Sequence, residues 1–304
     1  MTMTDAQRIQ NLTVPAGVID AVLDTDAYNE VDDQFAISLF LRMPERVRPL
    51  ALYAAPFYNS NSSGPADGME KSYDELGRLL PLLGREDLPR YRGSDRYLPS
   101  ETEAVDSPAA RDLIARAMPY SPERPLYVVA IGAITNVASA LLLAPEIKEK
   151  IVVVWLGGHS QDWAHTKEFN MVQDIAAARV VMGCGVPFVQ LPCMGVVDAF
   201  AISKPELEKW LVGKNPLADY LAKAVLHAQQ NSDYVWSRVI WDVTAVAWLF
   251  NDGERFMQSK LIPTPLPAYD GLYEHRANAP LCRYVHHISR DALMAELIRR
   301  LTEV

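Results

Sequence analysis

The sequence has few cysteines, no excess of basic residues and no long apolar run, and each absence excludes a class of protein. Its three cysteines are odd in number and widely spaced, without a CxxC pair, which argues against a disulfide framework or a cysteine zinc site. The net charge of −9 argues against binding to a nucleic-acid backbone. No apolar run reaches membrane-spanning length, and the start lacks the basic and apolar regions of a signal peptide. We therefore expect a cytoplasmic protein that binds neither nucleic acid nor membrane.

Apolar runs rich in β-branched residues alternate with helical patterns along most of the chain. The predicted strands of this alternation cover residues 17–23, 48–55, 126–131, 151–156 and 187–191. Beyond residue 205 the pattern becomes mostly helical, with a late strand over 283–288 and a final helix over 290–301. With 49% hydrophobic residues and no repeat or long linker, the chain is predicted to form a single α/β domain over 1–304. Its mainly parallel, Rossmann-like central sheet is flanked by helices.

The densest group of acidic residues follows the first predicted strand. Four aspartates and one glutamate lie within the ten residues from Asp24 to Asp33, before a helical pattern. In a parallel sheet this position lies beyond the carboxyl end of the strand, where such folds bind ligands. Carboxylates this close repel one another unless a cation neutralises them, and their oxygens suit Ca²⁺, Mg²⁺ or Mn²⁺. The turn therefore predicts a divalent metal site. The alternative is a solvated loop in which Asp32 caps the helix.

Three further polar segments follow later strands or open a helix. Gly132 to Asn136 follows the strand over 126–131, and Glu168-Phe169-Asn170 follows the strand over 151–156. A carboxylate and an amide side by side can hold vicinal hydroxyl groups through directed hydrogen bonds. Trp241-Asp242 begins a predicted helix, so that Asp242 is a candidate metal ligand. For all three segments the alternative is helix capping, a common role of Glu, Asp, Asn and Thr.

Taken in this order, the segments resemble the motifs of the inosine-uridine preferring nucleoside hydrolase family. The acidic turn is similar to the motif D-x-D-x-x-x-D-D, with a longer spacing of five residues between Asp26 and Asp32. Gly132 to Asn136 is similar to the turn T-G-P-L-T-N, and Glu168-Phe169-Asn170 matches the segment E-F-N. Trp241-Asp242 resembles the motif H-D-P, with Trp in place of the His that assists the departing base in many members.

The resemblance implies an activity, a cofactor and a set of site residues. The activity is hydrolysis of the N-glycosidic bond of ribonucleosides in nucleoside salvage, by a homodimer or homotetramer. The cofactor is Ca²⁺, and the implied ligands are Asp26, Asp33, Asp242 and the backbone carbonyl of Ile131. The implied substrate contacts are Asp32, Asn59, Leu156, Asp162, Glu168, Asn170, Trp241 and Asp242.

The chemistry of N-glycosidic cleavage assigns further roles. A metal-bound water would attack the anomeric carbon through an oxocarbenium-like transition state, with Asp26 as general base and Asp32 as a second catalytic residue on a sugar hydroxyl. Trp241 cannot usefully donate a proton to the departing base near neutral pH, although its ring can stack on one. The candidate donors are His159, His165, Tyr234 and the solvent.

Other functions remain open from the sequence. The Trp at position 241 and the altered spacing also fit a calcium-dependent ribose- or nucleoside-binding protein that has lost hydrolysis. Asp24-Thr25-Asp26 after a strand is also found in haloacid-dehalogenase phosphohydrolases, but Asn29 fits their D-x-D-x-T/V pattern poorly. A sugar-nucleotide transferase would need basic groups for the diphosphate, which do not stand near the D-x-D here. The nucleobase preference, which we expect the segments 57–68 and 227–240 to set, also remains open.

Overall fold

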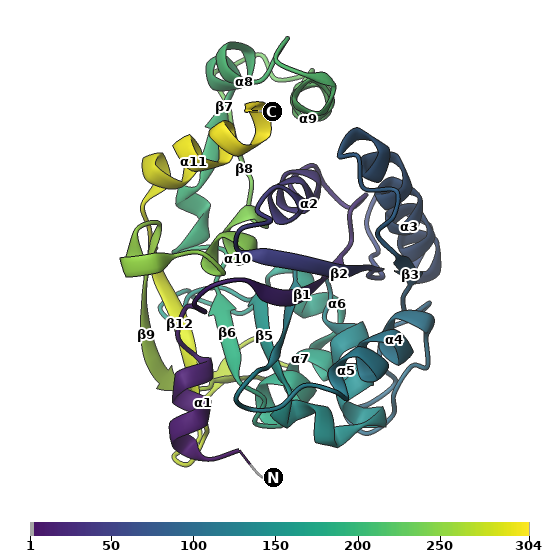
Figure 1. Ribbon diagram of the computed structural model, residues 1–304, viewed down its shortest axis with the longest axis vertical. Helices are drawn as coiled ribbons and strands as arrows, with labels where there is room; N and C mark the ends of the chain where they lie inside the picture. Colours follow the sequence, from purple (N-terminus) through teal and green to yellow (C-terminus); the bar gives the residue numbers. More distant parts are fainter. Residues whose placement is uncertain (1–2, 304) are drawn as a thin grey trace.

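The computed structural model describes residues 3–303 and contains one large central sheet. Its strands are β1 (Ile19–Thr25), β2 (Val47–Ala54), β3 (Arg90–Arg92), β4 (Leu126–Ala130), β5 (Ile151–Leu156), β6 (Phe188–Leu191), β9 (Met257–Pro263) and β12 (Leu281–Ile288). They lie in the order β3-β2-β1-β4-β5-β6-β12-β9 (Figure 1). All neighbours pair in parallel except β12 and β9. The predicted α/β class with a mainly parallel sheet is confirmed.

Helices cover both faces of this sheet. One face carries α2 (Asp33–Leu41), α3 (Pro65–Leu82), α10 (Val243–Trp248) and α11 (Arg290–Thr302), and the other carries α4 (Pro108–Ala117), α5 (Thr135–Leu143) and α7 (Ile175–Gly183) (Figure 1). The remaining α-helices are α1 (Asp5–Asn11), α6 (Phe169–Gln173), α8 (Lys204–Trp210) and α9 (Pro216–Ala228). Two small antiparallel ribbons pair β7 (Ala201–Ser203) with β8 (Ser237–Val239) and β10 (Leu266–Pro267) with β11 (Tyr273–Glu274). None of the helices within 3–303 is long and apolar enough to span a bilayer.

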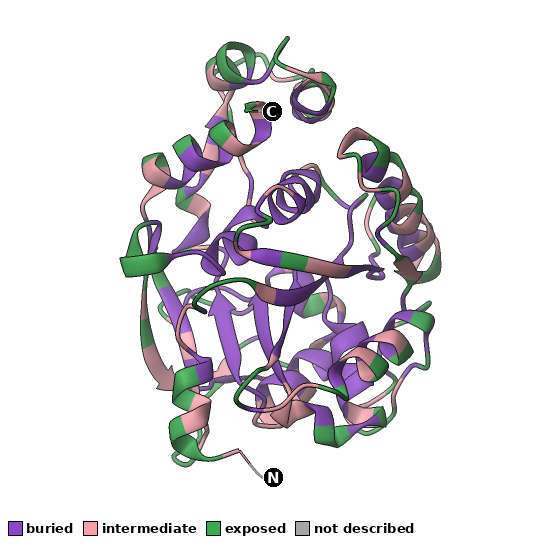
Figure 2. Cartoon of the chain, viewed as in Figure 1, coloured by how far each residue is buried: buried purple, intermediate pink, exposed green. Residues whose placement is uncertain are grey.

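The alternation of side chains along the central strands divides the core into two layers. In β1, Ala21 and Leu23 pack under α2 and α10, whereas Val22 packs on the opposite face among residues of α4 and α5. This period of two is expected for a strand whose faces are both covered by helices. The strands β1, β4, β5 and β6 are almost wholly buried, as Figure 2 shows for β5 and β6, so the turns at their ends have a rigid base.

Beyond residue 205 the chain contains the helices α8 to α11, but it also supplies strands that the sequence did not indicate, among them β9. β9 pairs antiparallel with β12 at the end of the sheet, and its residues alternate between buried or half-buried and exposed. Such an edge strand lacks the continuous apolar run that identified β4 and β5.

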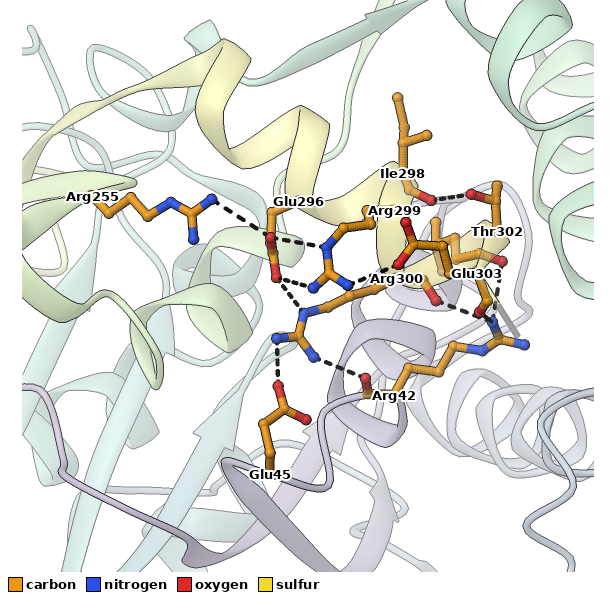
Figure 3. Close-up of polar contacts among 10 residues, drawn as sticks. Arg42, Glu45, Arg255, Glu296, Ile298, Arg299, Arg300, Thr302 and Glu303 are labelled. Carbon is orange, nitrogen blue, oxygen red and sulfur yellow. Dashed lines mark hydrogen bonds and ion pairs between the residues drawn. The ribbon is translucent and has the colours of Figure 1, made fainter.

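Helix α2, which begins at the acidic turn, is tied at its other end to the C-terminal helix. The guanidinium of Arg42 donates hydrogen bonds to the carbonyls of Arg300 (3.0 Å) and Leu301 (3.2 Å), which the last turn of α11 leaves without helical partners. Arg300 donates in return to the carbonyl of Arg42 (3.0 Å) and pairs with Glu296 and Glu45 (Figure 3). These reciprocal contacts fix the position of α2 relative to α11.

Candidate active site

A cavity of about 210 Å³ lies at the carboxyl edge of the sheet, beyond β1, β4 and β5. Seven of the residues that line it belong to the site expected from the sequence: Asp32, Ile131, Leu156, Glu168, Asn170, Trp241 and Asp242. Parallel strands end side by side at this edge, and loops that are distant in the sequence therefore meet there. A larger cavity, of about 470 Å³, lies around the N-terminal ends of β1 and β2 and contains none of the expected residues.

Acidic side chains from two distant segments gather beside the cavity. Asp32, Asp33 and Asp242 each offer an oxygen within 4.8 Å of the others, and all three are buried. Asp26, the first residue after β1, is 1% exposed, and Asp24, within β1, is fully buried. The neighbouring charges of Asp33 and Asp32 act on Asp26, which places it within electrostatic reach of this group.

Burial and mutual repulsion raise the pKa values of these carboxyls. Burial is the largest cause for Asp26, Asp32 and Asp242, whose pKa values lie well above 3.8, and the neighbouring acids raise them further. Burial also raises the pKa of Asp24 and of Asp33 to about 7, although each accepts a hydrogen bond that opposes the change. Without a cation, the site therefore disfavours the fully ionised state at neutral pH.

The capping alternative does not account for the two acids that begin helices. Asp32 stands at the N-cap of α2 and Asp242 at the N-cap of α10, but neither side chain makes a capping hydrogen bond. In contrast, Asp174 does cap α7 by accepting from the N–H of Ala177 (2.9 Å). The carboxylates of Asp32 and Asp242 thus remain available to a ligand.

The buried oxygens of Asp26 fit a cation as their partner. Both of them, and Oδ2 of Asp24, are buried without a hydrogen-bond partner among residues 3–303. A buried acceptor without a partner is costly, whereas carboxylate oxygens together with a backbone carbonyl are the ligands that Ca²⁺ prefers. The donor set expected from the sequence, Asp26, Asp33, Asp242 and the carbonyl of Ile131, is therefore chemically suited to a divalent ion.

Residues to which the sequence assigned no ligand role hold the acidic turn in place. The side-chain amide of Asn136 donates to Asp24 (2.7 Å), and its carbonyl accepts from the N–H of Ser94 (2.7 Å). The hydroxyl of Thr25 donates to Asp33 (2.5 Å). At Gly132 the chain passes so near the turn that a Cβ would lie 2.8 Å from Oδ1 of Asp26. Each of these contacts leaves the other oxygens of the acids free.

Glu168 and Asn170 combine structural contacts with a place in the cavity wall. Glu168 caps α6, accepting from the N–H groups of Asn170 (2.8 Å) and Met171 (2.9 Å), and also accepts from Gly158 (2.9 Å). The amide nitrogen of Asn170 donates to the carbonyls of Ile131 (3.2 Å) and Leu156 (3.1 Å). The capping role considered for Glu168 is thus real, and it also orients both side chains at the cavity.

Two expected substrate contacts do not reach the cavity. Asp162 lies on an exposed loop after β5 and is not among the cavity-lining residues. Asn59 is half-buried and donates to the side-chain oxygen of Asn29 (2.5 Å), which does line the cavity. The resemblance implied a substrate contact for Asp162, but the path of the loop carries its side chain outward.

The structure also reduces the list of candidate donors to the departing base. His159 lines the cavity, whereas His165 is exposed and Tyr234, 77% exposed, belongs to a loop that does not line the cavity. Cys193 and Met194, after β6, also line it. The sequence carried no signal for these two residues, since they reach the site only through the order of β5 and β6 in the sheet.

Comparison with known proteins identifies the family. Residues 21–264 match the family model of the inosine-uridine preferring nucleoside hydrolases, so the chain belongs to this family of enzymes, which act on N-glycosyl bonds. The pyrimidine-specific ribonucleoside hydrolase RihA of Citrobacter koseri is 29% identical to this chain over 246 residues, which are 72% of this chain and 75% of RihA. The resemblance found in the motifs is thereby confirmed.

Solved structures share the fold. A plant nucleoside hydrolase, PpNRh1, superposes with a TM-score of 0.75 at 18% identity and covers 94% of this chain and 99% of its own. A purine-preferring ribonucleoside hydrolase from Gardnerella vaginalis superposes with a TM-score of 0.74 at 20% identity, covering 93% and 98%. At these identities the likeness concerns the fold.

Proposed function

We propose that this protein is a Ca²⁺-dependent hydrolase that cleaves ribonucleosides, or a related N-riboside, into ribose and free base. The observation that carries the proposal is the group of buried carboxylates at one edge of the sheet, Asp24, Asp26, Asp32, Asp33 and Asp242. Their ionisation is costly unless a cation joins them. The cavity beside them is about 210 Å³, which suits a small ligand such as a nucleoside.

The metal would be held by Asp26, Asp33, Asp242 and the carbonyl of Ile131. The carbonyl already accepts from Asn170, but a carbonyl oxygen has two lone pairs and can serve both partners. A divalent ion in such a site lowers the pKa of bound water and offsets the charge of its ligands. We assign Ca²⁺ because the resemblance to the family implies it and the donors are all oxygens, which suit this ion.

The chain's own residues would then carry the proton and hold the sugar. Asp26, with both oxygens free of other hydrogen bonds among the described residues, takes the proton of the attacking water as general base. Asp32 lines the cavity and accepts from a sugar hydroxyl, which restrains the ribose as positive charge develops at its anomeric carbon. The remaining acids stabilise that charge electrostatically.

The opposite wall would orient the ribose. Because the amide nitrogen of Asn170 is engaged with two carbonyls, its oxygen is the group available to a hydroxyl. Glu168 lines the same wall, and each of its oxygens keeps a second lone pair. Leu156 supplies apolar contact, and Asn59 acts indirectly, by holding Asn29.

The base would lie against Trp241, which lines the cavity next to Asp242. An indole ring stacks on any nucleobase, so this contact alone does not choose between purines and pyrimidines. The pyrimidine specificity in the name of RihA makes pyrimidine ribonucleosides the first substrates to test. We further propose that residues 1–304 act as one nucleoside hydrolase-like domain in a homo-oligomer that serves cytoplasmic nucleoside salvage.

A panel of purine and pyrimidine ribonucleosides, assayed for ribose release with and without a calcium chelator, tests the proposal. Chelator-sensitive release is the expected result. The Trp at position 241 favours one other function, a calcium-dependent ribose- or nucleoside-binding protein. That function predicts calcium binding and protection by ribose against thermal unfolding, with no release from any nucleoside.

A further inference from the structure

His159 is the one histidine among residues 3–303 that lines the candidate active-site cavity. It follows Gly158 in the turn after β5 and is 6% exposed. Trp241 and Asp242 line the same cavity, so the ring of His159 shares it with the surface proposed to receive the base. The proposed mechanism has so far no group that stabilises the departing base through hydrogen bonding, and His159 is not used in any other role.

The backbone of this turn is fixed on several sides. Gly158 donates its N–H to Glu168 (2.9 Å) and accepts from the N–H of Cys193 (2.8 Å). The hydroxyl of Tyr273 donates to the carbonyl of His159 (3.1 Å). These bonds come from three separate segments, the α6 cap, the loop after β6 and β11, so the position of His159 is well determined.

A hydrogen bond to the ring also fixes its tautomer. The backbone N–H of Met194 donates to Nδ1 of His159 (3.3 Å), so Nδ1 is unprotonated and Nε2 carries the hydrogen. Nε2 makes no hydrogen bond of ordinary geometry within residues 3–303, although the backbone carbonyl of Lys167 lies close enough to the ring to raise its pKa. Nε2 is also not among the buried polar atoms that lack a partner, so part of its surface is open. Because His159 lines the cavity, the cavity can supply a partner to this open surface.

The surroundings keep the ring neutral. Burial lowers the pKa of His159, and the neighbouring His165, whose ring centre lies 5.4 Å away, lowers it further. The backbone carbonyl of Lys167 and the charge of Asp198 oppose this effect without reversing it. Protonation of Nδ1 would also bring two hydrogen-bond donors face to face, the N–H of Met194 and the Nδ1–H of the ring. A neutral imidazole is a poor acid, but its N–H is a good hydrogen-bond donor.

We propose that His159 is a catalytic residue that donates the Nε2–H hydrogen bond to the departing nucleobase. This inference rests on the proposed hydrolase function. As the bond between C1′ and the base nitrogen breaks, its electron pair moves into the base, and the hydrogen bond stabilises the resulting negative charge. His159 keeps its proton. Water supplies the hydroxyl that joins C1′, and the proton released from that water returns through solvent to the free base.

A pair of substitutions separates this role from others, because glutamine and asparagine each reproduce one nitrogen of the ring. His159→Gln places an amide near the position of Nε2 and keeps a neutral donor toward the cavity. His159→Asn keeps a polar group near Nδ1 but has no donor at the position of Nε2. We expect kcat/KM on ribonucleosides to fall on the order of 10²-fold for His159→Asn and by less than about tenfold for His159→Gln.

A substrate whose leaving group needs no hydrogen bond from the enzyme supplies the second readout. p-Nitrophenyl β-D-ribofuranoside releases a phenolate that is stable as an anion, so both variants should cleave it within about threefold of the unmodified enzyme. The matched control is His165→Gln, because His165 is exposed, contacts the same ring and does not line the cavity. It should leave both activities unchanged.

The pH dependence distinguishes a neutral donor from a general acid. For a neutral donor, the ratio of kcat/KM between the unmodified enzyme and His159→Asn stays constant from pH 7 to 9, whereas for an imidazolium acid it falls about tenfold per pH unit. The proposal is overturned if His159→Asn retains full activity on nucleosides, if the ratio falls with pH, or if cleavage of the nitrophenyl riboside is lost equally.

Two further outcomes would show which part of the proposal has failed. Loss of nucleoside hydrolysis in Lys167→Met, with none in His159→Asn, would make the neighbouring lysine the donor, since it also lines the cavity. If the unmodified protein cleaves neither nucleosides nor the nitrophenyl riboside, the hydrolase function itself fails. That result is distinct from failure of the His159 role.

Discussion

Removal of the divalent metal should destabilise the folded protein, and the loss should be larger at neutral pH than in mild acid. In the metal-free protein the buried acids hold their protons more tightly than they do in the unfolded chain. The folded state therefore binds more protons than the unfolded state between the two sets of pKa values. Under that condition the free energy of unfolding falls as the pH rises.

The size of this loss of stability follows from the two carboxyls whose pKa values are raised only moderately. Burial raises the pKa of Asp24 and of Asp33 from 3.8 to about 7. For one such carboxyl the change corresponds to about 4 kcal/mol, which is lost as the pH rises from about 4 to about 7. Because Asp33 is coupled to its neighbours, the second carboxyl adds less than the first. At about 2 °C per kcal/mol for a large domain, one carboxyl lowers the Tm by about 8 °C.

Differential scanning calorimetry of chelator-treated protein at pH 5 and at pH 7.5 covers about 2.5 kcal/mol of this change, which corresponds to about 5 °C for one carboxyl. Added Ca²⁺ should remove most of it, since the ion replaces the protons that the site otherwise needs. Asp24→Asn is the matched control, because the amide retains the oxygen that accepts from Asn136 and cannot titrate. A metal-free protein with the same Tm at both pH values, or a higher one at pH 7.5, would refute the reasoning.

Three further predictions concern individual residues. Asp26→Ala and Asp242→Ala should each lower kcat on ribonucleosides by at least about 10³-fold. Both should also weaken calcium binding, as measured by calorimetric titration, with unchanged far-UV circular dichroism. Full turnover in either variant would contradict the metal assignment. Gly132→Ala should weaken calcium binding, because its Cβ would lie 2.8 Å from Oδ1 of Asp26, and an unchanged calcium Kd would contradict this. Arg42→Met removes the link between α2 and α11, whose residues do not line the cavity. It should lower the free energy of unfolding, measured in urea, by about 1–3 kcal/mol and leave kcat at saturating calcium unchanged. A loss of kcat without a loss of stability would contradict this prediction.

Most of the layout of the site could be predicted from the sequence, because all of its segments except Trp241-Asp242 follow an apolar strand. Asp26 to Asp33 follows β1, Ile131 and Gly132 follow β4, and Glu168 follows β5. In a parallel sheet these strand ends must meet at one edge, so sequence order alone implies proximity. The short helix α6 and the edge strand β9 escaped prediction, because neither carries a long enough periodic pattern.

Other features depend on the path of loops, which no local pattern encodes. Asp162 has the spacing of a ribose contact, but its loop directs it to solvent. His159 was one candidate among several, and only the hydrogen bond from Met194, on the loop after β6, indicates which of its nitrogens faces the cavity. For Glu168, helix capping and ligand binding are alternatives in the sequence, but one carboxylate can do both, since each oxygen has two lone pairs.

Hydrolysis should depend on the ion that the buried carboxylates are proposed to hold. The most direct measurement is ribose release from uridine and from inosine by metal-free protein during stepwise addition of Ca²⁺, with calcium binding followed on the same samples. Release should be absent at the start and rise in proportion to the bound calcium until the site is full. Full activity in the metal-free protein, or calcium binding that saturates with no release from any ribonucleoside, would contradict it.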